Sequence, residues 1–171
     1  MAQLCVESLE WVRAANSVES SHVEGVADAL AAAARVDALD YSQGWSDQSV
    51  DLYARAMQRV NQALLLNPDQ ATAHFTKARL IMYKTKPNDA ASANEIIAEA
   101  EATLRADPSF AQAYHPMAVG EMLLGRYEQA ISHLEQAMRI SPRDSFVGLW
   151  HMEMGRAFLG CEEPTRRSRK A

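Results

Sequence analysis

The chain contains few of the residues that build disulfide-linked, metal-bound or reactive sites. It has two cysteines, Cys5 and Cys161, near opposite ends, which is too few for a disulfide framework and fits a reducing compartment. Its seven glycines are scattered, so none form a phosphate-binding loop. No serine or cysteine lies in a recognisable nucleophile turn, and the five histidines lack the spacing of a known metal motif. The sequence therefore predicts no enzyme activity, no metal and no cofactor.

Long hydrophobic runs are also lacking. There is no stretch of about 18 apolar residues, so no transmembrane helix is expected. The first seven residues, Met1 to Glu7, lack the basic region and apolar core of a secretory signal. With 171 residues, of which 48% are hydrophobic and 23% charged, the chain is long enough to bury one core. These features predict one soluble domain with a cytoplasmic location.

Charge is distributed unevenly along the chain. Residues 1–51 carry nine acids and two bases, residues 52–160 carry eleven of each, and residues 161–171 carry two acids and four bases. The acidic first segment would repel nucleic acid and anionic membranes, and a short basic tail would add only about 1 kcal/mol per charge near such a surface. We therefore expect neither nucleic acid nor a membrane as partner, and we expect residues 161–171 to form a flexible basic tail.

A repeated proline marks the ends of three similar segments. Pro68, Pro108 and Pro142 each follow a helix-like run and a polar residue, and the last two are 34 positions apart (142 − 108). Between them, apolar residues recur at helical spacing in two successive stretches, which predicts two packed helices. Small residues in both stretches would let the helix axes approach closely, and Gly125 with Arg126 marks where the first helix stops and the chain reverses.

This 34-residue period resembles the tetratricopeptide repeat (TPR), a hairpin of two helices. The resemblance implies an all-α fold, a TPR-like right-handed superhelix of antiparallel helix hairpins (an α-α solenoid) with about 7–8 helices, in a single domain over residues 1–160. TPR modules are binding scaffolds, so it also implies a non-catalytic function. The matching positions are Tyr114, Met117, Ala118, Glu121, Gly125, Ala130, Leu134, Ala137 and Pro142.

The best repeat spans residues 109–142, and the repeat before it spans residues 69–108. The earlier repeat is six residues longer than the usual length, and the surplus around Lys84 to Asp89 predicts an elongated loop between its two helices. Ser92 followed by Glu95 is a capping box, which is expected to begin the second helix of that repeat.

The N-terminal part of the chain fits the repeat less well. Residues 51–68 match the second helix of a partial repeat, but residues 40–45 do not supply a good first helix. We expect residues 1–50 to form divergent helices, one with weak periodicity over residues 3–17 and one from a capping box at Ser21 to near Leu39.

Three residues depart from the TPR pattern. Lys77 stands where a large apolar residue is usual, and Ile96 stands where a small one is usual. Pro116 lies several residues into the first helix of the best repeat, where a proline removes a backbone hydrogen bond. It predicts a kink or a late helix start around His115 and Pro116.

The first helices of successive repeats line the concave groove of a TPR array, and the resemblance assigns groove positions on that basis. Aromatic and methionine side chains with one arginine suit a peptide or helix that carries apolar anchors and an acidic group. Several of these side chains are as compatible with core packing, which makes Arg79, Tyr83, Gln112 and His115 the stronger candidates. His115 could add a pH-dependent charge to the groove, although a structural histidine is more common. The full set is Thr72, Phe75, Arg79, Met82 and Tyr83 in one repeat and Gln112, His115, Val119, Met122 and Leu123 in the next.

One TPR activity can be tested on the sequence. TPR domains that hold a chaperone tail use lysine and asparagine one turn apart on the first groove helix and basic residues on a later one. Here Phe75 and Arg79, then His115 and Val119, stand at the comparable places, so the resemblance argues against a chaperone-adaptor role.

The last helix lacks a second helix to pair with. Residues 145–160 resemble the first half of a further repeat, with Trp150, Met154 and Phe158 on one side. Such a helix can cap the array, or it can leave an apolar face for a partner, including a second copy of the chain. A homodimer through this helix is therefore a candidate.

The sequence between residues 50 and 160 is also similar to TPR regions of bacterial signalling proteins, notably class III adenylate cyclases and winged-helix regulators. The similarity rests on Leu124 to Ile131 and on Ser141 to Asp144. The leading hypothesis is a protein-interaction scaffold that binds a peptide or partner helix in the groove. The alternative is a self-associating or regulatory fragment related to those bacterial signalling proteins.

Overall fold

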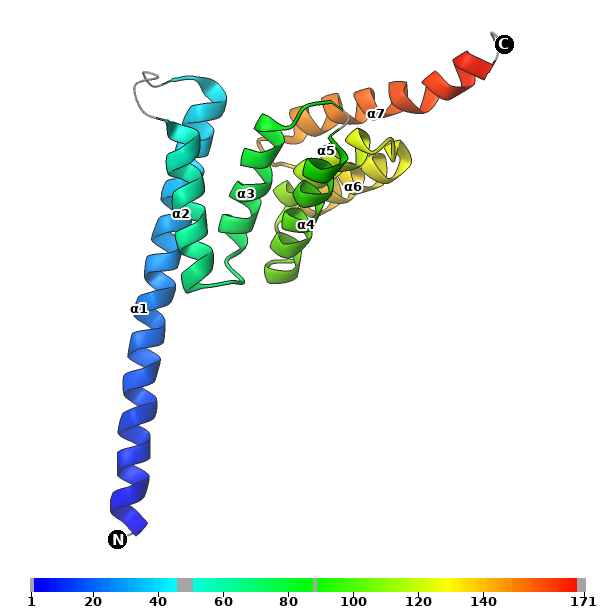
Figure 1. The fold of residues 1–171 in the computed structure, drawn as a ribbon. Coiled ribbons are helices and arrows are strands. Elements are labelled where there is room, and N and C mark those ends of the chain that lie inside the picture. Colours follow the sequence, from blue (N-terminus) through cyan, green and yellow to red (C-terminus); the bar gives the residue numbers. More distant parts are fainter. Residues whose placement is uncertain (1, 46–50, 88, 169–171) are drawn as a thin grey trace.

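A computed structural model describes the backbone of residues 2–45, 51–87 and 89–168 and the side chains of residues 21–45, 51–87 and 89–162. Within these ranges the chain forms seven α-helices and one short 3₁₀-helix, and it contains no strand (Figure 1). The all-α fold with about 7–8 helices is therefore confirmed. The elements are α1 (Ala2–Gln43), α2 (Leu52–Leu66), α3 (Ala71–Lys84), α4 (Ala90–Ala106), η1 (Ala111–Ala113), α5 (Tyr114–Leu123), α6 (Tyr127–Ile140) and α7 (Val147–Ser168).

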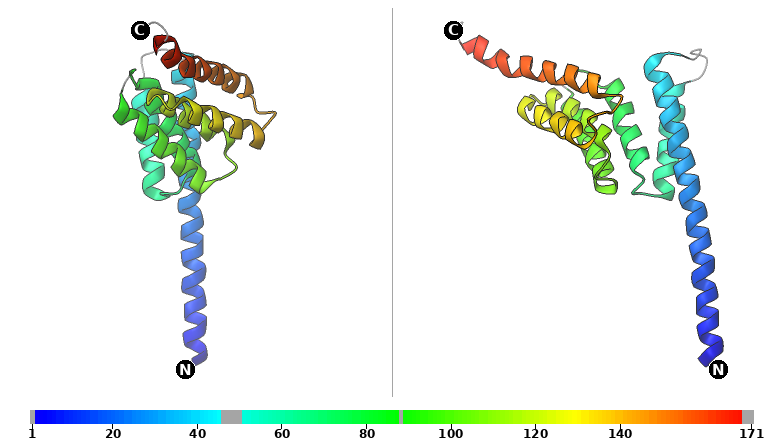
Figure 2. Two further views of the ribbon diagram at one scale, coloured as in Figure 1. Left: turned by 90° about the vertical axis from the view of Figure 1, so that its right-hand side faces the viewer. Right: turned by 180° about the vertical axis from the view of Figure 1, so that it is seen from behind.

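The helices pair as successive hairpins. α1 packs against α2, α3 against α4 and α5 against α6, and α7 then packs against α6 (Figures 1 and 2). The first helices of neighbouring hairpins also touch, since α1 contacts α3 and α3 contacts α5. The N-terminal half of α1 projects beyond the hairpins as a long single helix (Figure 2). The first helices of the three hairpins thus lie next to one another.

The turns between hairpins explain the repeated prolines. Each proline follows the residue that ends α2, α4 or α6, and these cap residues have φ values of −137°, −139° and −135°. Proline disfavours the helical conformation in the residue before it, so the helix stops there. The carbonyl of each cap residue accepts a hydrogen bond, at 3.1 to 3.2 Å, from the amide three residues later, which closes a turn with proline at its second position. The cap residues are Asn67, Asp107 and Ser141.

The N-terminal segment forms one helix rather than two. α1 runs without a break from Ala2 to Gln43, so the expected start at Ser21 and the expected lack of a good first helix are both wrong. A serine and a glutamate three residues apart also occur inside exposed helices, so the capping box alone does not mark a helix start. An alanine stripe on α1 packs against small residues of α2 and holds the helix in place. The buried residues of this contact are Ala31, Ala34 and Ala38 of α1 and Ala56, Val60 and Ala63 of α2.

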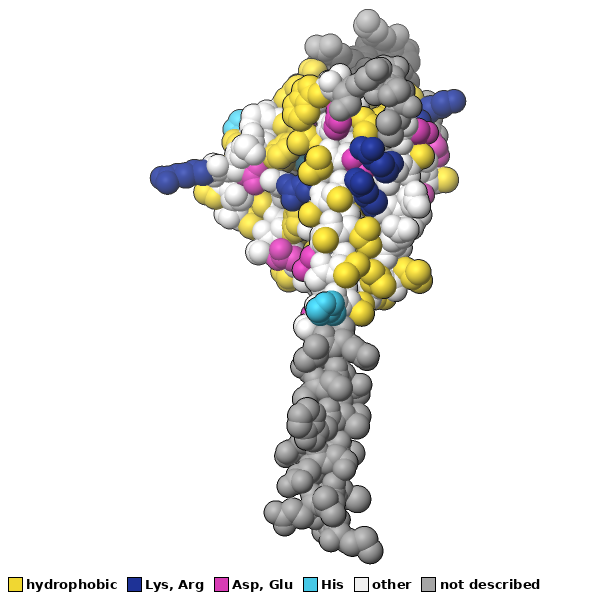
Figure 3. All heavy atoms as spheres, turned by 90° about the vertical axis from the view of Figure 1, so that its left-hand side faces the viewer, with side chains coloured by type: hydrophobic (Ala, Val, Ile, Leu, Met, Phe, Trp, Pro, Cys, Tyr) yellow, Lys and Arg dark blue, Asp and Glu magenta, His cyan; other side chains and the backbone are white. Residues whose placement is uncertain are grey.

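A buried ion pair also joins α1 to α2. The carboxylate of Asp37 on α1 is only 4% exposed, and it accepts hydrogen bonds from Arg55 at 2.7 and 3.0 Å and from Arg59. Two guanidinium groups therefore compensate for the loss of water around this carboxylate. Seen from the α1 side, the described part of the molecule shows basic and acidic side chains interspersed with hydrophobic ones, without a broad patch of one charge (Figure 3).

The second hairpin accounts for two departures from the repeat pattern. Lys77 Nζ lies 2.6 Å from Glu99 Oε1, and His74 Nδ1 lies 2.6 Å from the other oxygen of the same carboxylate. This network replaces the usual apolar contact between α3 and α4. Ile96 is fully buried in the place of a small residue. The repeat therefore keeps its hairpin with different packing chemistry.

The connection between α3 and α4 is long, as predicted, but α4 begins earlier than predicted. α3 ends at Lys84 and α4 begins at Ala90. Asp89 caps α4, because its carboxylate accepts hydrogen bonds from the amide of Ser92 at 3.1 Å and from the hydroxyl of Ser92 at 2.7 Å. Ser92 thus donates hydrogen bonds to the cap residue, Asp89. The prediction that Ser92 itself caps the helix, in a capping box with Glu95, is wrong.

The third hairpin has the turn and the late start that its sequence predicts. Gly125 has φ +74°, and the amide of Arg126 donates to the carbonyl of Glu121 at 2.8 Å, which is the geometry of a glycine C-cap. η1 precedes α5, and α5 begins at Tyr114, so Pro116 lies in the first turn. The first four amides of a helix have no partner within it, so a proline there removes no helical hydrogen bond. The late start is confirmed.

The last helix is longer than predicted. α7 spans Val147 to Ser168, so residues 161–168 are helical where the sequence predicted a flexible basic tail. The predicted half-repeat over residues 145–160 is the N-terminal part of this helix. No second helix pairs with α7 within the described residues.

Gly120 lies at a close approach between the second and third hairpins and provides a test of the packing. A Cβ at this position would lie 2.8 Å from Ile97 Cγ1 and 2.9 Å from the backbone oxygen of Ala93. We expect Gly120→Ala to lower the free energy of unfolding by about 1–3 kcal/mol, because α4 and α5 must move apart. Urea unfolding monitored by circular dichroism measures this change.

The matched control is Gly155→Ala, at an exposed position in α7 where no atom lies within 4 Å of the added Cβ. It should raise the free energy of unfolding by about 0.5–1 kcal/mol, through helix propensity alone. Equal effects of the two substitutions in dilute protein would contradict the close approach of α4 and α5.

Candidate functional site

Arg79 on α3 is surrounded by aromatic rings. Its guanidinium carbon lies 5.6 Å from the ring centroid of Phe75, 5.4 Å from that of Tyr83 and 5.8 Å from that of Phe146. Phe75 and Tyr83 lie one turn before and after Arg79 on α3, whereas Phe146 lies just before α7. Arg79 also donates a hydrogen bond to the Tyr83 hydroxyl. Among the described residues, no carboxylate forms an ion pair with Arg79. We call these four residues the Arg79 cluster.

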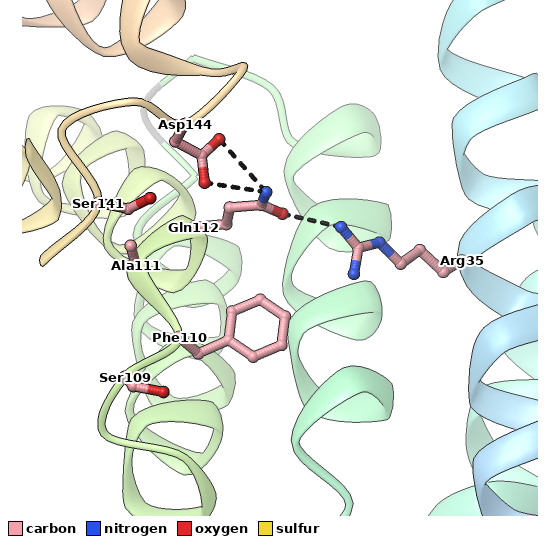
Figure 4. A pocket seen from close by; sticks show the side chains of 7 residues that line it. All are labelled: Arg35, Ser109, Phe110, Ala111, Gln112, Ser141 and Asp144. Atoms are coloured by element: carbon pink, nitrogen blue, oxygen red, sulfur yellow. Dashed lines mark hydrogen bonds between the residues drawn. The ribbon is translucent and has the colours of Figure 1, made fainter.

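A chain of hydrogen bonds runs beside the Arg79 cluster and links three parts of the fold. Arg35 Nη2 on α1 donates to Gln112 Oε1 at 2.8 Å, and Gln112 Nε2 on η1 lies 3.3 and 3.4 Å from the two carboxylate oxygens of Asp144 (Figure 4). Arg35 also lies over Phe75, at 5.4 Å from the ring centroid. Phe75 is therefore shared between two guanidinium groups.

Arg35, Gln112 and Asp144 border a small open cleft of about 200 Å³. In Figure 4, Arg35 reaches toward Gln112 from α1, and Asp144 reaches toward it from the loop before α7. Burial lowers the pKa of the Arg35 guanidinium, and Arg79 lowers it further, while Asp144 acts in the opposite direction. The site thus holds two cations against one nearby carboxylate. The cleft is lined by Arg35, Ser109, Phe110, Ala111, Gln112, Ser141 and Asp144.

His115 lies in the first turn of α5 and is only 8% exposed. Burial lowers its pKa from 6.5 to about 4, and the positive charge of Arg79 contributes to the shift. Its Nε2 atom is buried without a hydrogen-bond partner among the described residues. His115 is therefore neutral at pH 7, so the expectation that it adds a pH-dependent charge near neutrality is wrong.

The other predicted groove residues divide between the inner face and the core. Phe75 is 2% exposed, and its ring makes a tilted contact with that of Phe110, with the centroids 4.9 Å apart, so it is a packed part of the site. Met122 packs against the hydrophobic core of α5, α6 and α7. Thr72, Met82, Val119 and Leu123 are half-buried. The structure thus brings Arg79, Tyr83, Phe75, Gln112 and His115 together and packs Met122 against the core.

Four residues of this site were missing from the sequence prediction: Arg35, Phe110, Asp144 and Phe146. Arg35 was missed because α1 was not recognised as the first helix of a repeat. The regular spacing of alanines on α1 could have shown it, because the stripe matches the small residues of α2. The 34-residue period could have shown two others, since it places Phe146 at the position of Gln112 and Asp144 at that of Phe110.

The residues predicted for self-association do not form one exposed surface. Trp150 is fully buried in the core between α6 and α7, and Met154 is partly buried against the same core. Only Phe158 of the three is exposed, at 52%. The sequence predicts these three residues on one side of the helix, but the face that contains Trp150 is the one that packs against α6.

Two features are absent from the described part of the chain. No helix there is long and apolar enough to cross a membrane. No group of three potential metal ligands gathers in it either.

Two solved structures resemble this fold. The TPR domain of Arabidopsis OM64 superimposes with a TM-score of 0.59 at 13% identity, covering 78% of this chain and 98% of that one. The TPR2B domain of yeast Sti1, in a structure described as its complex with pHsp70, gives a TM-score of 0.59 at 18% identity, covering 76% and 97%. No protein-family model and no curated protein sequence matches the chain. The chain therefore has a TPR-like fold.

The buried His115 provides a test of the site through pH. The unfolded state binds a proton below about pH 6.5 and the folded state only near pH 4, so acid favours unfolding in this window. Between about pH 7 and pH 5, we expect the wild type to lose about 2 kcal/mol more free energy of unfolding than the His115→Gln variant. Urea unfolding at the two pH values measures this difference.

Other histidines do not interfere with that comparison. Hydrogen bonds to Glu99 and Glu121 raise the pKa values of His74 and His133, so these two residues stabilise the fold as pH falls through their folded pKa values. Their contribution is the same in both proteins and cancels in the difference. If wild type and variant lost the same free energy of unfolding between the two pH values, burial would not lower the pKa of His115 in the folded state.

Proposed function

We propose that the chain is a non-catalytic scaffold that binds a peptide or a partner helix on the face formed by α1, α3 and α5, with Arg79 receiving an acidic group. The observation that carries this proposal is the Arg79 cluster, in which a guanidinium is held by aromatic rings and has no carboxylate of its own among the described residues. A guanidinium has five N–H donors, and only one hydrogen bond, to Tyr83, involves a described residue.

The chemistry of the site favours an acidic and partly apolar ligand. Aromatic contacts restrict the Arg79 side chain, so less entropy is lost when it binds a carboxylate. A carboxylate can accept two parallel hydrogen bonds from a guanidinium. The surrounding rings of Tyr83 and Phe146 offer apolar surface beside that charge, as aromatic and arginine residues commonly do at the centre of protein interfaces.

The fold likeness supports the class of function and leaves the ligand open. The Sti1 structure is of a complex with pHsp70, and that fact concerns Sti1. In this chain, two of the four places comparable to the chaperone clamp hold buried side chains, Phe75 and His115. The proposed partner is therefore an internal acidic segment of a protein rather than a chaperone tail. A cytoplasmic location and a relation to bacterial signalling proteins are part of this proposal.

A phage-displayed random peptide library, selected against the full chain, tests the proposal. We expect the selected peptides to share an acidic residue next to an apolar one. Arg79→Glu should weaken their binding at least about tenfold, because it replaces a charge-assisted hydrogen bond with repulsion. The control is Arg139→Glu, at an exposed arginine of α6, which should change the dissociation constant less than about twofold.

A double-mutant cycle identifies the contact. Replacing the peptide's acidic residue by its amide should weaken binding to the wild type but have little further effect on Arg79→Gln. Independent losses in the two arms would place the acidic group elsewhere. Selection of peptides without acidic residues would contradict the role of Arg79.

A further inference from the structure

The side of α7 that faces away from α6 is exposed and apolar. α7 packs against α6 through Trp150 and Ala157, which are fully buried. On the opposite side, two large apolar side chains are more than half exposed, Met152 at 53% and Leu159 at 67%. Gly148 lies four residues before Met152, and Gly155 lies between Met152 and Leu159; no atom lies within 4 Å of a Cβ built at either glycine. The four residues of this α7 outer face are Gly148, Met152, Gly155 and Leu159.

The spacing of the α7 outer face is that of a helix-packing seam. Its residues follow one another at intervals of four, three and four, which are the intervals of the a and d positions in a heptad. Large and absent side chains alternate along the seam. In an antiparallel pair of helices, each a position faces a d position of the other helix, so residues of the two classes meet.

We propose that the α7 outer face is the interface of a homodimer in which two α7 helices pack antiparallel about a two-fold axis near residues 153 and 154. In this arrangement Met152 of one copy faces Gly155 of the other, and Leu159 faces Gly148. Each large side chain therefore enters a space left by a glycine. The same four residues serve both copies, as a two-fold symmetric interface requires.

Charge and position also favour a second copy of the chain as the occupant. The four seam residues are uncharged, and the neighbouring Arg156 is held by Glu153 of its own helix at 3.1 Å, so two copies bring no unpaired like charges together. The α7 outer face lies opposite the side that packs against α6, and in a longer hairpin array the terminal helix would pack against a further helix. A seam of three turns buries less than the roughly 1,200 Å² of a stable interface, so the dimer is reversible and depends on concentration.

Sedimentation velocity of the full chain from about 1 μM to about 1 mM tests the dimer. We expect the wild-type mass to rise toward that of a dimer, and Leu159→Glu to remain a monomer because it places a charge opposite Gly148. The control Leu65→Glu makes the same change at an 84% exposed leucine of α2 and should associate like the wild type. A wild-type monomer throughout, or a Leu159→Glu protein that dimerises like the wild type, would overturn the proposal.

Exchanging the large and the small residue at positions 152 and 155 tests the antiparallel register. Gly155→Met places methionine against Met152 of the second copy and should raise the dimer dissociation constant at least about tenfold. The double variant Met152→Gly with Gly155→Met restores one large side chain per glycine and should recover most of that loss. A tighter Gly155→Met dimer would indicate parallel pairing, and a double variant without recovery would also overturn this register. All substituted positions are exposed, and circular dichroism checks that each variant is folded.

Discussion

The fold depends on the close approach of paired helices over small residues. Alanines occupy the crossing points of each hairpin, as in the contact between Ala34 on α1 and the small residues of α2. An alanine contributes little apolar area, so the stabilisation comes from the many dispersion contacts that two nearby helix backbones make. Helices at such a distance leave no room for an added methyl group. Gly120 is an example, because even a Cβ at this position would collide with α4.

This close packing also creates the candidate site. Because α1 contacts α3 and α3 contacts α5, side chains of α1, η1 and the loop before α7 meet within a single hydrogen-bonded group. Arg35, Gln112 and Asp144 are far apart in the sequence, yet they form one chain of contacts beside Arg79. Two guanidinium groups share the ring of Phe75, and that ring also contacts the ring of Phe110. The rigidity of the repeats is thus what orients the polar groups of the inner face.

The sequence predicts the parts of this structure that one residue type can determine. Gly125 requires a positive φ, and proline both ends a helix before Asn67-Pro68 and delays the start of α5 at Pro116. These effects are local, so a pattern of residues is sufficient to find them. The exposed or buried state of a residue depends on what packs against it. Trp150 was therefore expected on an exposed face and is buried, although it lies on a predicted helix.

α1 shows why other parts of the structure could not be predicted from the sequence. Its first turns carry no stop signal, and its contact with α2 rests on alanine, which favours helices in many contexts and identifies no partner.

The Arg79 cluster and the α7 outer face are two separate surfaces near α7. Phe146 belongs to the Arg79 cluster, while the α7 outer face points away from α6. A dimer through that outer face would leave both Arg79 clusters uncovered by the seam residues. Two such sites in one particle would bind a ligand with two acidic segments more tightly than either site alone, because the second contact forms at a high effective concentration.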